Sequence, residues 1–171
     1  TYFCPLPSTV TRIALGERGA TDSLFTGIAA SLERIWQLRQ AIKASNSETV
    51  LSFVAGNNIL CVIACIGLGK RLIISERNDP ALQSLGVAWD FLRKLTYPRA
   101  DVVTANSHGA IGSLETFVPK NKLRYVPNPM VRFQISAKHQ DRKPLIINVA
   151  RLYPQKRQDN LIDAFALIAS D

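Results

Sequence analysis

The sequence of 171 residues holds few of the side chains that build metal sites and disulfides. Its 3 cysteines, Cys4, Cys61 and Cys65, are odd in number, and its 2 histidines, His108 and His139, give no zinc-ligand spacing. Cys61 and Cys65 stand one helical turn apart in an apolar segment, which favours buried free thiols over a disulfide. We therefore expect no metal, no prosthetic group and a reducing, cytoplasmic compartment.

Long hydrophobic runs and phosphate-binding glycine motifs are absent as well. The longest apolar segment, NNILCVIACIGLG, has about half the length of a membrane span, so we expect a buried helix. The N-terminal letters TYFCPLPSTV do not have the pattern of a signal peptide. No Gly-x-Gly-x-x-Gly or Walker loop occurs, and GLGK at 67–70 precedes a strand pattern, which predicts the end of a helix.

Positive charge, in contrast, is plentiful. The chain has 21 Lys and Arg against 13 Asp and Glu, a formal charge of +8. The cations are spread along the chain: Arg34, Arg39 and Lys43; Lys70 and Arg71; Arg93, Lys94 and Arg99; Lys120 to Arg124; Lys138 to Lys143. Scatter of this kind favours solvated faces over a dedicated polyanion groove. No aromatic-basic repeat or recognition-helix signature is present, so we expect no nucleic-acid partner, with a non-catalytic polyanion-binding module as an alternative.

Short β-branched runs alternate with helical patterns through the chain. The strand candidates are 10–16, 49–56, 71–76, 100–107, 123–128 and 144–150. The helix candidates are 24–45, 57–67, 80–97, 108–117 and 158–170. This alternation predicts an α/β fold with a Rossmann-like parallel sheet, whose strands are buried on both faces. Asp79 before Pro80, and Ser107, are the expected N-caps of two helices.

Polar residues follow two neighbouring strands at the edge where an open α/β sheet places its ligand crevice. Asn57 and Asn58 come after the strand at 49–56, and Glu76 and Arg77 come after the next one. These four side chains offer donors and acceptors for a hydroxyl-rich ligand. A capped turn with an Arg-Glu pair is the alternative interpretation of the second group.

Two prolines in YVPNPMVRF predict a stiff connector near Asn128. We accordingly expect one domain over 1–127, a hinge over 128–143 and the start of a second domain over 144–171. The closing stretch predicts a strand, a basic loop and a helix beginning near Gln158. Arg151 and Lys156 of that loop, beside the free N–H groups of a helix start, suit a phosphate group, although solvated loop cations are an equal alternative.

Taken together, these stretches resemble the GT-B glycosyltransferases of family 4. NVARLYPQKRQDNLIDAFALIAS is similar to the opening of the C-terminal domain of that family, and YVPNP is similar to its interdomain hinge. SERNDP and PRADVVTANSHGA resemble passages of its N-terminal domain. Order and spacing match from about Val50 to Ser170. Ala150 stands where the family usually has glycine, and Arg157 where it often has glycine or asparagine.

The resemblance implies a retaining hexosyltransferase that uses a nucleotide-diphosphate sugar as donor and a glycan or lipid-linked acceptor, in polysaccharide or glycolipid synthesis. Arg151 and Lys156 would then contact the donor diphosphate and act in catalysis, without a metal. Asn57, Asn58, Glu76 and Arg77 would contact the acceptor. A nucleotide-sugar epimerase or a glycogen-type synthase shares this architecture and is a further alternative.

The family pattern also extends beyond both ends of the sequence. We expect the chain to be an internal fragment of a longer enzyme that lacks activity by itself, because the glycine-rich acceptor loop and the donor-site glutamates are not in it. Peripheral contact with the inner face of a membrane is a further expectation. It rests on the predicted helix with Arg34, Arg39 and Lys43 beside Trp36 and Leu38. A helix packed on the sheet with a basic outer face is the alternative.

Overall fold

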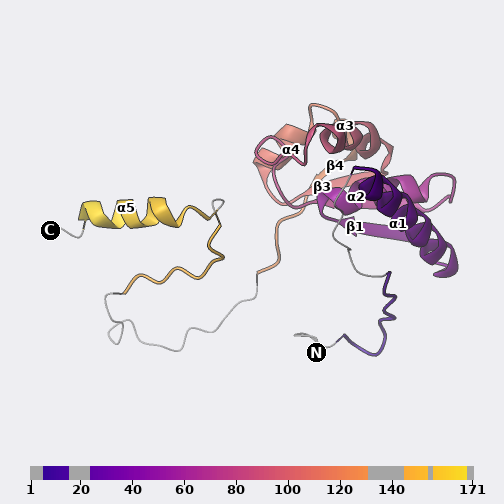
Figure 1. Ribbon diagram of the computed structural model, residues 1–171, viewed down its shortest axis with the longest axis horizontal. Coiled ribbons are helices and arrows are strands. Elements are labelled where there is room, and N and C mark those ends of the chain that lie inside the picture. The colour runs from indigo at the N-terminus through magenta and orange to yellow at the C-terminus, as the bar shows by residue number, and fades with distance from the viewer. Residues whose placement is uncertain (1–5, 16–23, 131–144, 154–155, 169–171) are drawn as a thin grey trace. The chain divides into compact units, whose positions relative to one another are not determined.

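The structure is a computed structural model, and it describes residues 6–15, 24–130, 145–153 and 156–168 (Figure 1). It divides into two compact units, 1–129 and 130–171. The first unit is α/β, with a four-stranded parallel sheet. The predicted fold class is therefore confirmed.

The sheet consists of β1 (Thr49–Phe53), β2 (Arg71–Glu76), β3 (Val102–Ala105) and β4 (Leu123–Tyr125) in the order β1-β2-β3-β4. Every pair is parallel, with Leu51 opposite Ile73 and Ile73 opposite Val102. Because all four strands run in the same direction, their carboxyl ends meet at one edge of the sheet.

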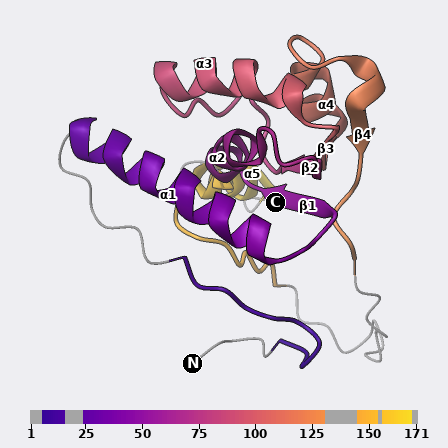
Figure 2. The same cartoon turned by 90° about the vertical axis from the view of Figure 1, so that its right-hand side faces the viewer.

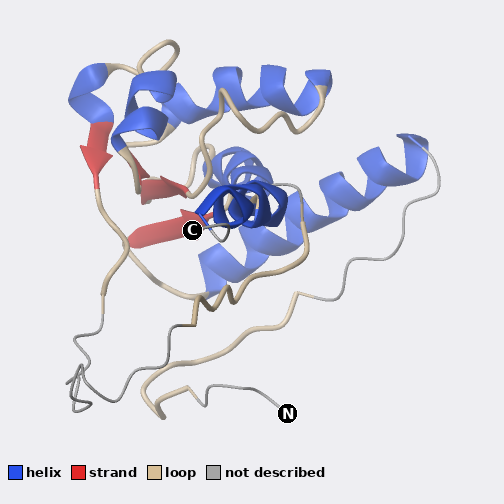
Figure 3. Cartoon of the chain, turned by 90° about the vertical axis from the view of Figure 1, so that its left-hand side faces the viewer, coloured by secondary structure: helices blue, strands red, loops and turns tan. Residues whose placement is uncertain are grey.

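Helices connect and precede these strands. They are α1 (Leu24–Ala44), α2 (Ala55–Cys65), α3 (Val87–Thr96), the short η1 (Tyr97–Arg99), α4 (His108–Leu114) and η2 (Lys120–Lys122). Each strand lies next to the strand that follows it in the sequence, so all three connections move across the sheet in the same direction. Because such connections are right-handed, they place α2, α3 and α4 on the same face of the sheet. For the first unit, Figures 2 and 3 show α2, α3 and α4 on one side of the strands.

The hydrophobic core lies between this helical layer and one face of the sheet. Ile59 of α2, Ile74 of β2, Val103 of β3 and Leu114 of α4 are each 0% exposed. Tyr97 of η1 is also 0% exposed, and it is the largest of the fully buried side chains. The fully buried position of this tyrosine matters for the site below, because its hydroxyl group needs polar partners.

The opposite face of the sheet is not buried in the same way, which corrects the expectation of strands buried on both faces. Leu51 and Phe53 of β1 are 56% and 48% exposed. They alternate with Val50 and Ser52, which point to the other face of the sheet. The physical reason is the strand order, which directs every connecting helix of the described chain to one side.

Helix ends follow the predicted signals at two places and depart from them at a third. Gly67 and Gly69 after α2 have positive φ angles of 71° and 64°, and the Ser107 side chain accepts from the backbone N–H of Ala110 at 3.2 Å. The predicted N-cap at Asp79 is wrong, because α3 begins only at Val87. Asp79 closes a single turn there, and Gly86, at φ 95°, separates that turn from the helix.

The thiols of α2 behave as the sequence predicts. Cys61 and Cys65 are free and buried, whereas Cys4 lies outside the described residues. A hydrogen bond with Cys65, together with burial, raises the pKa of the Cys61 thiol. This thiol therefore stays protonated and behaves as part of the core.

Several of the scattered cations donate to backbone carbonyl groups, Arg39 and Lys122 among them. Arg39 of α1 donates to the carbonyl oxygens of Ala64 and Ile66 at 2.8 and 2.7 Å, so it caps the C-terminal end of α2. Lys122 donates to the carbonyl oxygens of Pro98 and Ala100 at 2.7 and 2.9 Å. Leu38 packs against the core, while Trp36 is 61% exposed.

The second unit contains α5 (Gln158–Ile168) among its described residues. The predicted strand at 144–150 is wrong over its described part, since 145–150 is irregular, and the predicted strand at 10–16 is likewise irregular over 10–15. A parallel strand needs a neighbour for its backbone hydrogen bonds, and no described strand pairs with either segment. The predicted hinge over 128–143 falls largely outside the described residues.

Candidate functional site

The candidate site of the first unit is the row of loops at the carboxyl edge of the sheet. The loop after β1 turns directly into α2 through Val54, which has φ 74° and ψ 133°. A β-branched residue rarely adopts a positive φ, so this turn carries backbone strain. The Val54 N–H donates to the carbonyl oxygen of Ser75 at 3.3 Å, which holds the strained turn against β2.

Asn58, in the first turn of α2, connects the loop to the core. It is 0% exposed, and its side-chain amide donates to the carbonyl oxygen of Ser75 at 2.9 Å and to the Tyr97 hydroxyl at 3.2 Å. Its Oδ1 atom has no hydrogen-bond partner among the described residues. Asn58 therefore positions the turn from inside the fold.

Glu76, the last residue of β2, is a buried carboxylate with a complete set of donors. It is 1% exposed, and its Oε2 atom accepts from the Tyr97 hydroxyl at 2.7 Å. Its Oε1 atom accepts from the backbone N–H groups of Arg77 and Asn78 at 3.0 and 3.3 Å. Burial, followed by the charge of Glu76, raises the pKa of Tyr97, so the tyrosine remains a donor.

Arg77 is the side chain that extends from this buried network toward the loop after β4. Its Nη2 atom donates to Oδ1 of Asn128. Asn128 is exposed and lies between the two prolines of the predicted connector, and Arg77 is partly exposed. The pair joins the loops after β2 and β4, which the sequence alone did not place together.

The four residues predicted to contact an acceptor thus fall into two kinds. Asn57 and Arg77 are accessible, whereas Asn58 and Glu76 are buried and have internal partners. All four lie at the carboxyl ends of β1 and β2: Asn57 and Asn58 in the first turn of α2, and Glu76 and Arg77 where β2 ends. Contact of any of them with a ligand stays a prediction.

Two further contacts at this edge were not predicted from the sequence. The rings of His108 and Tyr125 are stacked, with centroids 4.2 Å apart and an interplanar angle of 25°. Ser113 of α4 donates to Oδ1 of Asp79 at 2.6 Å, which ties the loop after β2 to α4. Both contacts depend on neighbouring strands, and no local sequence signal indicates them.

The second unit presents its predicted donor residues on an irregular loop before α5. Arg151 and Lys156 are both exposed. The Gln158 side-chain amide donates to the Arg151 carbonyl oxygen at 2.8 Å, and the Lys156 N–H donates to the Tyr153 carbonyl oxygen at 2.8 Å. Both cations therefore lie near the N-terminal turn of a helix of 11 residues. Free N–H groups and cations together favour an anion.

The described residues contain no candidate metal site and no candidate membrane span. Within them, no three His, Cys, Asp or Glu side chains lie close enough together to hold a metal ion. No described helix has both the length and the apolar character that crossing a membrane requires.

The chain is similar to a protein of Campylobacter jejuni named GalNAc-alpha-(1->4)-GalNAc-alpha-(1->3)-diNAcBac-PP-undecaprenol alpha-1,4-N-acetyl-D-galactosaminyltransferase. The two share 31% identical residues over 148 residues, which is 85% of this chain and 40% of the relative. The chain thus spans less than half the length of this curated relative. No family model matches the chain. A glycosyltransferase relative agrees with the resemblance noted in the sequence, and the assignment to GT-B family 4 stays a prediction.

Proposed function

We propose that this chain is part of a retaining glycosyltransferase of the GT-B type that transfers a sugar from a nucleotide-diphosphate donor to a lipid-linked acceptor. The observation that carries the proposal is the similarity, over 85% of the chain, to a relative named as an undecaprenol-linked N-acetylgalactosaminyltransferase. The parallel sheet with polar loops at its carboxyl edge supports it, because ligands of such folds bind at that edge.

Arg151 and Lys156 are the proposed donor-diphosphate residues. Cleavage of a sugar–phosphate bond builds negative charge on the departing diphosphate. Cations that are already in position stabilise this charge in the transition state more than in the ground state. The exposed side chains at the start of α5 can reach a ligand without breaking any internal packing. This arrangement supports metal-free stabilisation of the leaving group by the chain itself.

On the acceptor side, we assign different roles to the two kinds of residue. Asn57 and Arg77 are accessible and would bind the acceptor by hydrogen bonds. Asn58 and Glu76 would hold the loops in place from the core, through Ser75 and Tyr97. Rigid loops lower the entropy cost of orienting an acceptor hydroxyl toward the donor sugar.

Membrane contact is also part of the proposal, since the relative is named for a lipid-linked acceptor. Ile28, Leu32 and Trp36 of α1 recur every fourth residue and are 52%, 61% and 61% exposed. They form an apolar stripe, with Arg34 and Lys43 on the same helix. A peripheral helix with this pattern suits an anionic membrane surface at the inner leaflet.

The decisive experiment uses the full-length enzyme, the donor nucleotide sugar and the Lys156→Ala variant. We expect kcat/KM to fall about 10²- to 10³-fold, as is typical when one transition-state donor is removed. The thermal unfolding temperature should not change, because Lys156 is exposed. Lys120→Ala, which removes an exposed cation of the first unit, is the matched control and should retain activity. Unchanged turnover in Lys156→Ala would refute the donor assignment, and an inverted product anomer would refute retention.

A further inference from the structure

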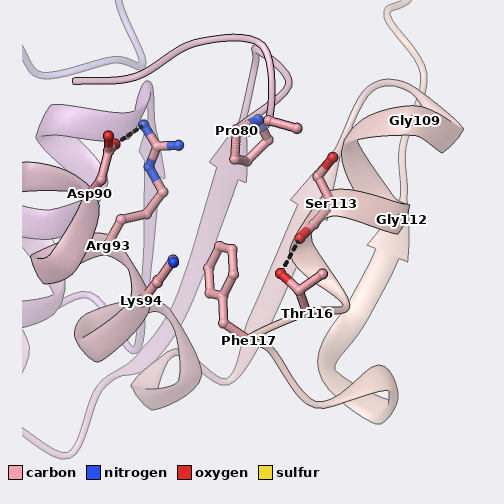
Figure 4. A pocket seen from close by; sticks show the side chains of 10 residues that line it. Pro80, Asp90, Arg93, Lys94, Gly109, Gly112, Ser113, Thr116 and Phe117 are labelled. Atoms are coloured by element: carbon pink, nitrogen blue, oxygen red, sulfur yellow. Dashed lines mark hydrogen bonds and ion pairs between the residues drawn. The ribbon is translucent and has the colours of Figure 1, made fainter. Parts of the chain in front are cut away.

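A groove of about 580 Å³ opens between α3 and α4, lined also by Pro80 and Ala81 of the loop after β2. Figure 4 shows Arg93 and Lys94 of α3 on one wall and Ser113 and Thr116 on the other. None of these wall residues was predicted from the sequence to bind a ligand. The groove is therefore separate from the predicted donor and acceptor residues.

Arg93 is the unusual feature of this groove, because it is a buried cation with weak internal pairing. The residue is 3% exposed. Its Nη2 atom lies 3.4 Å from Oδ1 of Asp90 and 3.4 Å from the Gln83 carbonyl oxygen, and its Nε atom has no partner among the described residues. Charge-assisted hydrogen bonds are normally shorter, about 2.7 to 2.9 Å. A buried guanidinium with long contacts and an unused donor is unfavourable, and an anion in the groove would stabilise it.

The carboxylates near the groove, in contrast, each accept two hydrogen bonds from protein donors. Asp90 accepts from the Ser84 hydroxyl and from the Leu85 N–H at 3.1 Å. Those two hydrogen bonds, in that order, hold the pKa of Asp90 below its ordinary value. Asp79 accepts from the Ser113 hydroxyl at 2.6 Å and from the Ala81 N–H at 2.9 Å. Both negative charges are thus engaged by protein donors.

Lys94 supplies a second cation on the same wall. It is exposed, and it makes no hydrogen bond and no ion pair within the described part of the chain. An ammonium and a guanidinium on one wall, opposite two hydroxyl groups, match the oxygens of a phosphate or diphosphate.

The opposite wall leaves room for such a group. Gly112 of α4 is exposed, and a Cβ atom placed on it would have no heavy atom within 4 Å. A Cβ atom on Gly109 would lie 3.2 Å from Oδ2 of Asp79. Glycine at 112 therefore keeps space open that a side chain could occupy without a clash.

Exposed apolar side chains neighbour the groove residues Ala81, Asp90 and Lys94 along the chain. Leu82, which follows the groove residue Ala81, is 87% exposed. Val87 and Phe91, one turn apart on α3, are 91% and 65% exposed. Large apolar side chains with this much exposed surface suit contact with an apolar partner. A ligand with an anionic end and a hydrocarbon end fits this combination.

We propose that the α3–α4 groove binds the diphosphate of a prenyl-linked ligand, with Arg93 and Lys94 on the phosphates and Leu82, Val87 and Phe91 along the first prenyl units. The prenyl part rests on the proposed function, since the relative's name contains a diphosphate-linked undecaprenol. The anion part rests on the groove alone. The site differs from the donor loop at Arg151 and Lys156, which would take the nucleotide diphosphate.

The test titrates the full chain, carrying the Lys156→Ala substitution, with each probe. Amide chemical shifts in NMR spectra monitor binding. Inorganic pyrophosphate and geranyl diphosphate are the two probes, and the shifts of Lys94 and Gly112 report the groove. We expect both probes to shift these amides, and geranyl diphosphate to bind at least about threefold more tightly because it also buries apolar surface. Lys94→Gln should weaken both about threefold to tenfold.

Gly112→Leu places a side chain in the groove. It tests whether binding can be blocked while the fold stays intact. Leucine has a higher helix propensity than glycine, so the variant should unfold at the same temperature or a higher one while binding is lost. Lys120→Gln removes an exposed cation that does not line the groove, and this variant should bind as the parent does. No shift at the groove, or equal binding by Gly112→Leu, overturns the proposal. Equal affinity for both probes overturns its prenyl part.

This outcome is independent of the donor assignment. Loss of turnover in Lys156→Ala tests the proposed function, whereas groove shifts are measured in a chain that already lacks that lysine. If the groove binds the probes and Lys156→Ala keeps full turnover, the anion site stands and the donor assignment fails. If neither probe shifts the groove amides and Lys156→Ala loses turnover, the donor assignment stands and the groove is not an anion site.

Discussion

The two regions with predicted site residues are held in place in different ways. At the sheet edge of the first unit, Asn58 and Glu76 are 0% and 1% exposed and both contact the Tyr97 hydroxyl. In the loop before α5, Arg151 and Lys156 are exposed, and their backbone bonds are local. A buried polar residue is thus fixed by tertiary contacts, while a loop cation depends on its own short segment. Substitutions of the buried residues in the first region should affect stability, and substitutions of the loop cations in the second should affect ligand binding.

The largest expected difference between the two regions comes from Glu76. Glu76→Leu leaves the Tyr97 hydroxyl and the N–H groups of Arg77 and Asn78 without their acceptor. We expect the free energy of unfolding to fall by about 3 kcal/mol or more, measured by urea unfolding. Arg151→Leu, in the exposed loop, should change it by less than about 0.5 kcal/mol. Equal losses in both variants would contradict the comparison.

Two adjacent asparagines offer a matched pair within the first region. Asn58 donates to Ser75 and Tyr97 from a buried position, while Asn57 is exposed. Asn58→Ala should lower the free energy of unfolding by about 2 kcal/mol, because a buried carbonyl and a hydroxyl lose a partner. Asn57→Ala should cost less than about 0.5 kcal/mol and instead weaken acceptor binding. A stability loss at Asn57 equal to that at Asn58 would show that exposure does not separate their roles.

Backbone strain gives a smaller and opposite effect. Val54 has φ 74°, and Val54→Gly should stabilise the chain by about 0.5 to 1 kcal/mol, since relief of the strained conformation exceeds the entropy cost of glycine. Val126 is the control, because it is also 50% exposed but is absent from the positive-φ residues. Val126→Gly should destabilise by a similar amount. Thermal unfolding of both variants measures the difference in sign, and stabilisation at both positions would argue against strain at Val54.

The smallest effect concerns acid stability beside the α3–α4 groove. The Ser84 hydroxyl and the Leu85 N–H lower the pKa of Asp90 in the folded chain. A depressed carboxyl pKa stabilises the fold above the unfolded-state value, about 4, and this contribution is lost as the pH falls through the folded-state pKa. Ser84→Ala should therefore unfold at a slightly higher pH in an acid titration. The same substitution should have little influence on alkaline unfolding, and an alkaline shift of equal size would exclude Asp90 as the cause.

Much of the fold was predictable because the patterns are local. The predicted strands at 49–56, 71–76, 100–107 and 123–128 contain the shorter or equal strands β1 to β4. Ser107 became an N-cap, and Gly67 and Gly69 ended α2. The segments at 10–16 and 144–150 also contain several β-branched residues, but they did not become strands over their described residues. Composition predicts that a segment can pair, and only a neighbouring strand decides whether it does.

The candidate site likewise has features that the sequence predicts and features that only the structure shows. The residue types after β1 and β2, and the cations near α5, could be read directly from the printed sequence. The link between Arg77 and Asn128, which are 51 residues apart, could not be read from it. Arg93 was one of many scattered cations in the sequence, and its burial next to a groove emerged only in the structure.

The sequence by itself determined the alternation of elements, the parallel sheet and the identity of the polar residues at its carboxyl edge, because hydrophobic periodicity and caps act over a few residues. Tertiary structure alone decided which polar side chains are buried. Strand order placed α2, α3 and α4 on one face, and the packing of Tyr97 under the loops turned Asn58 and Glu76 inward while Asn57 stayed exposed. Burial depends on contacts between residues far apart in the chain, which no local pattern contains.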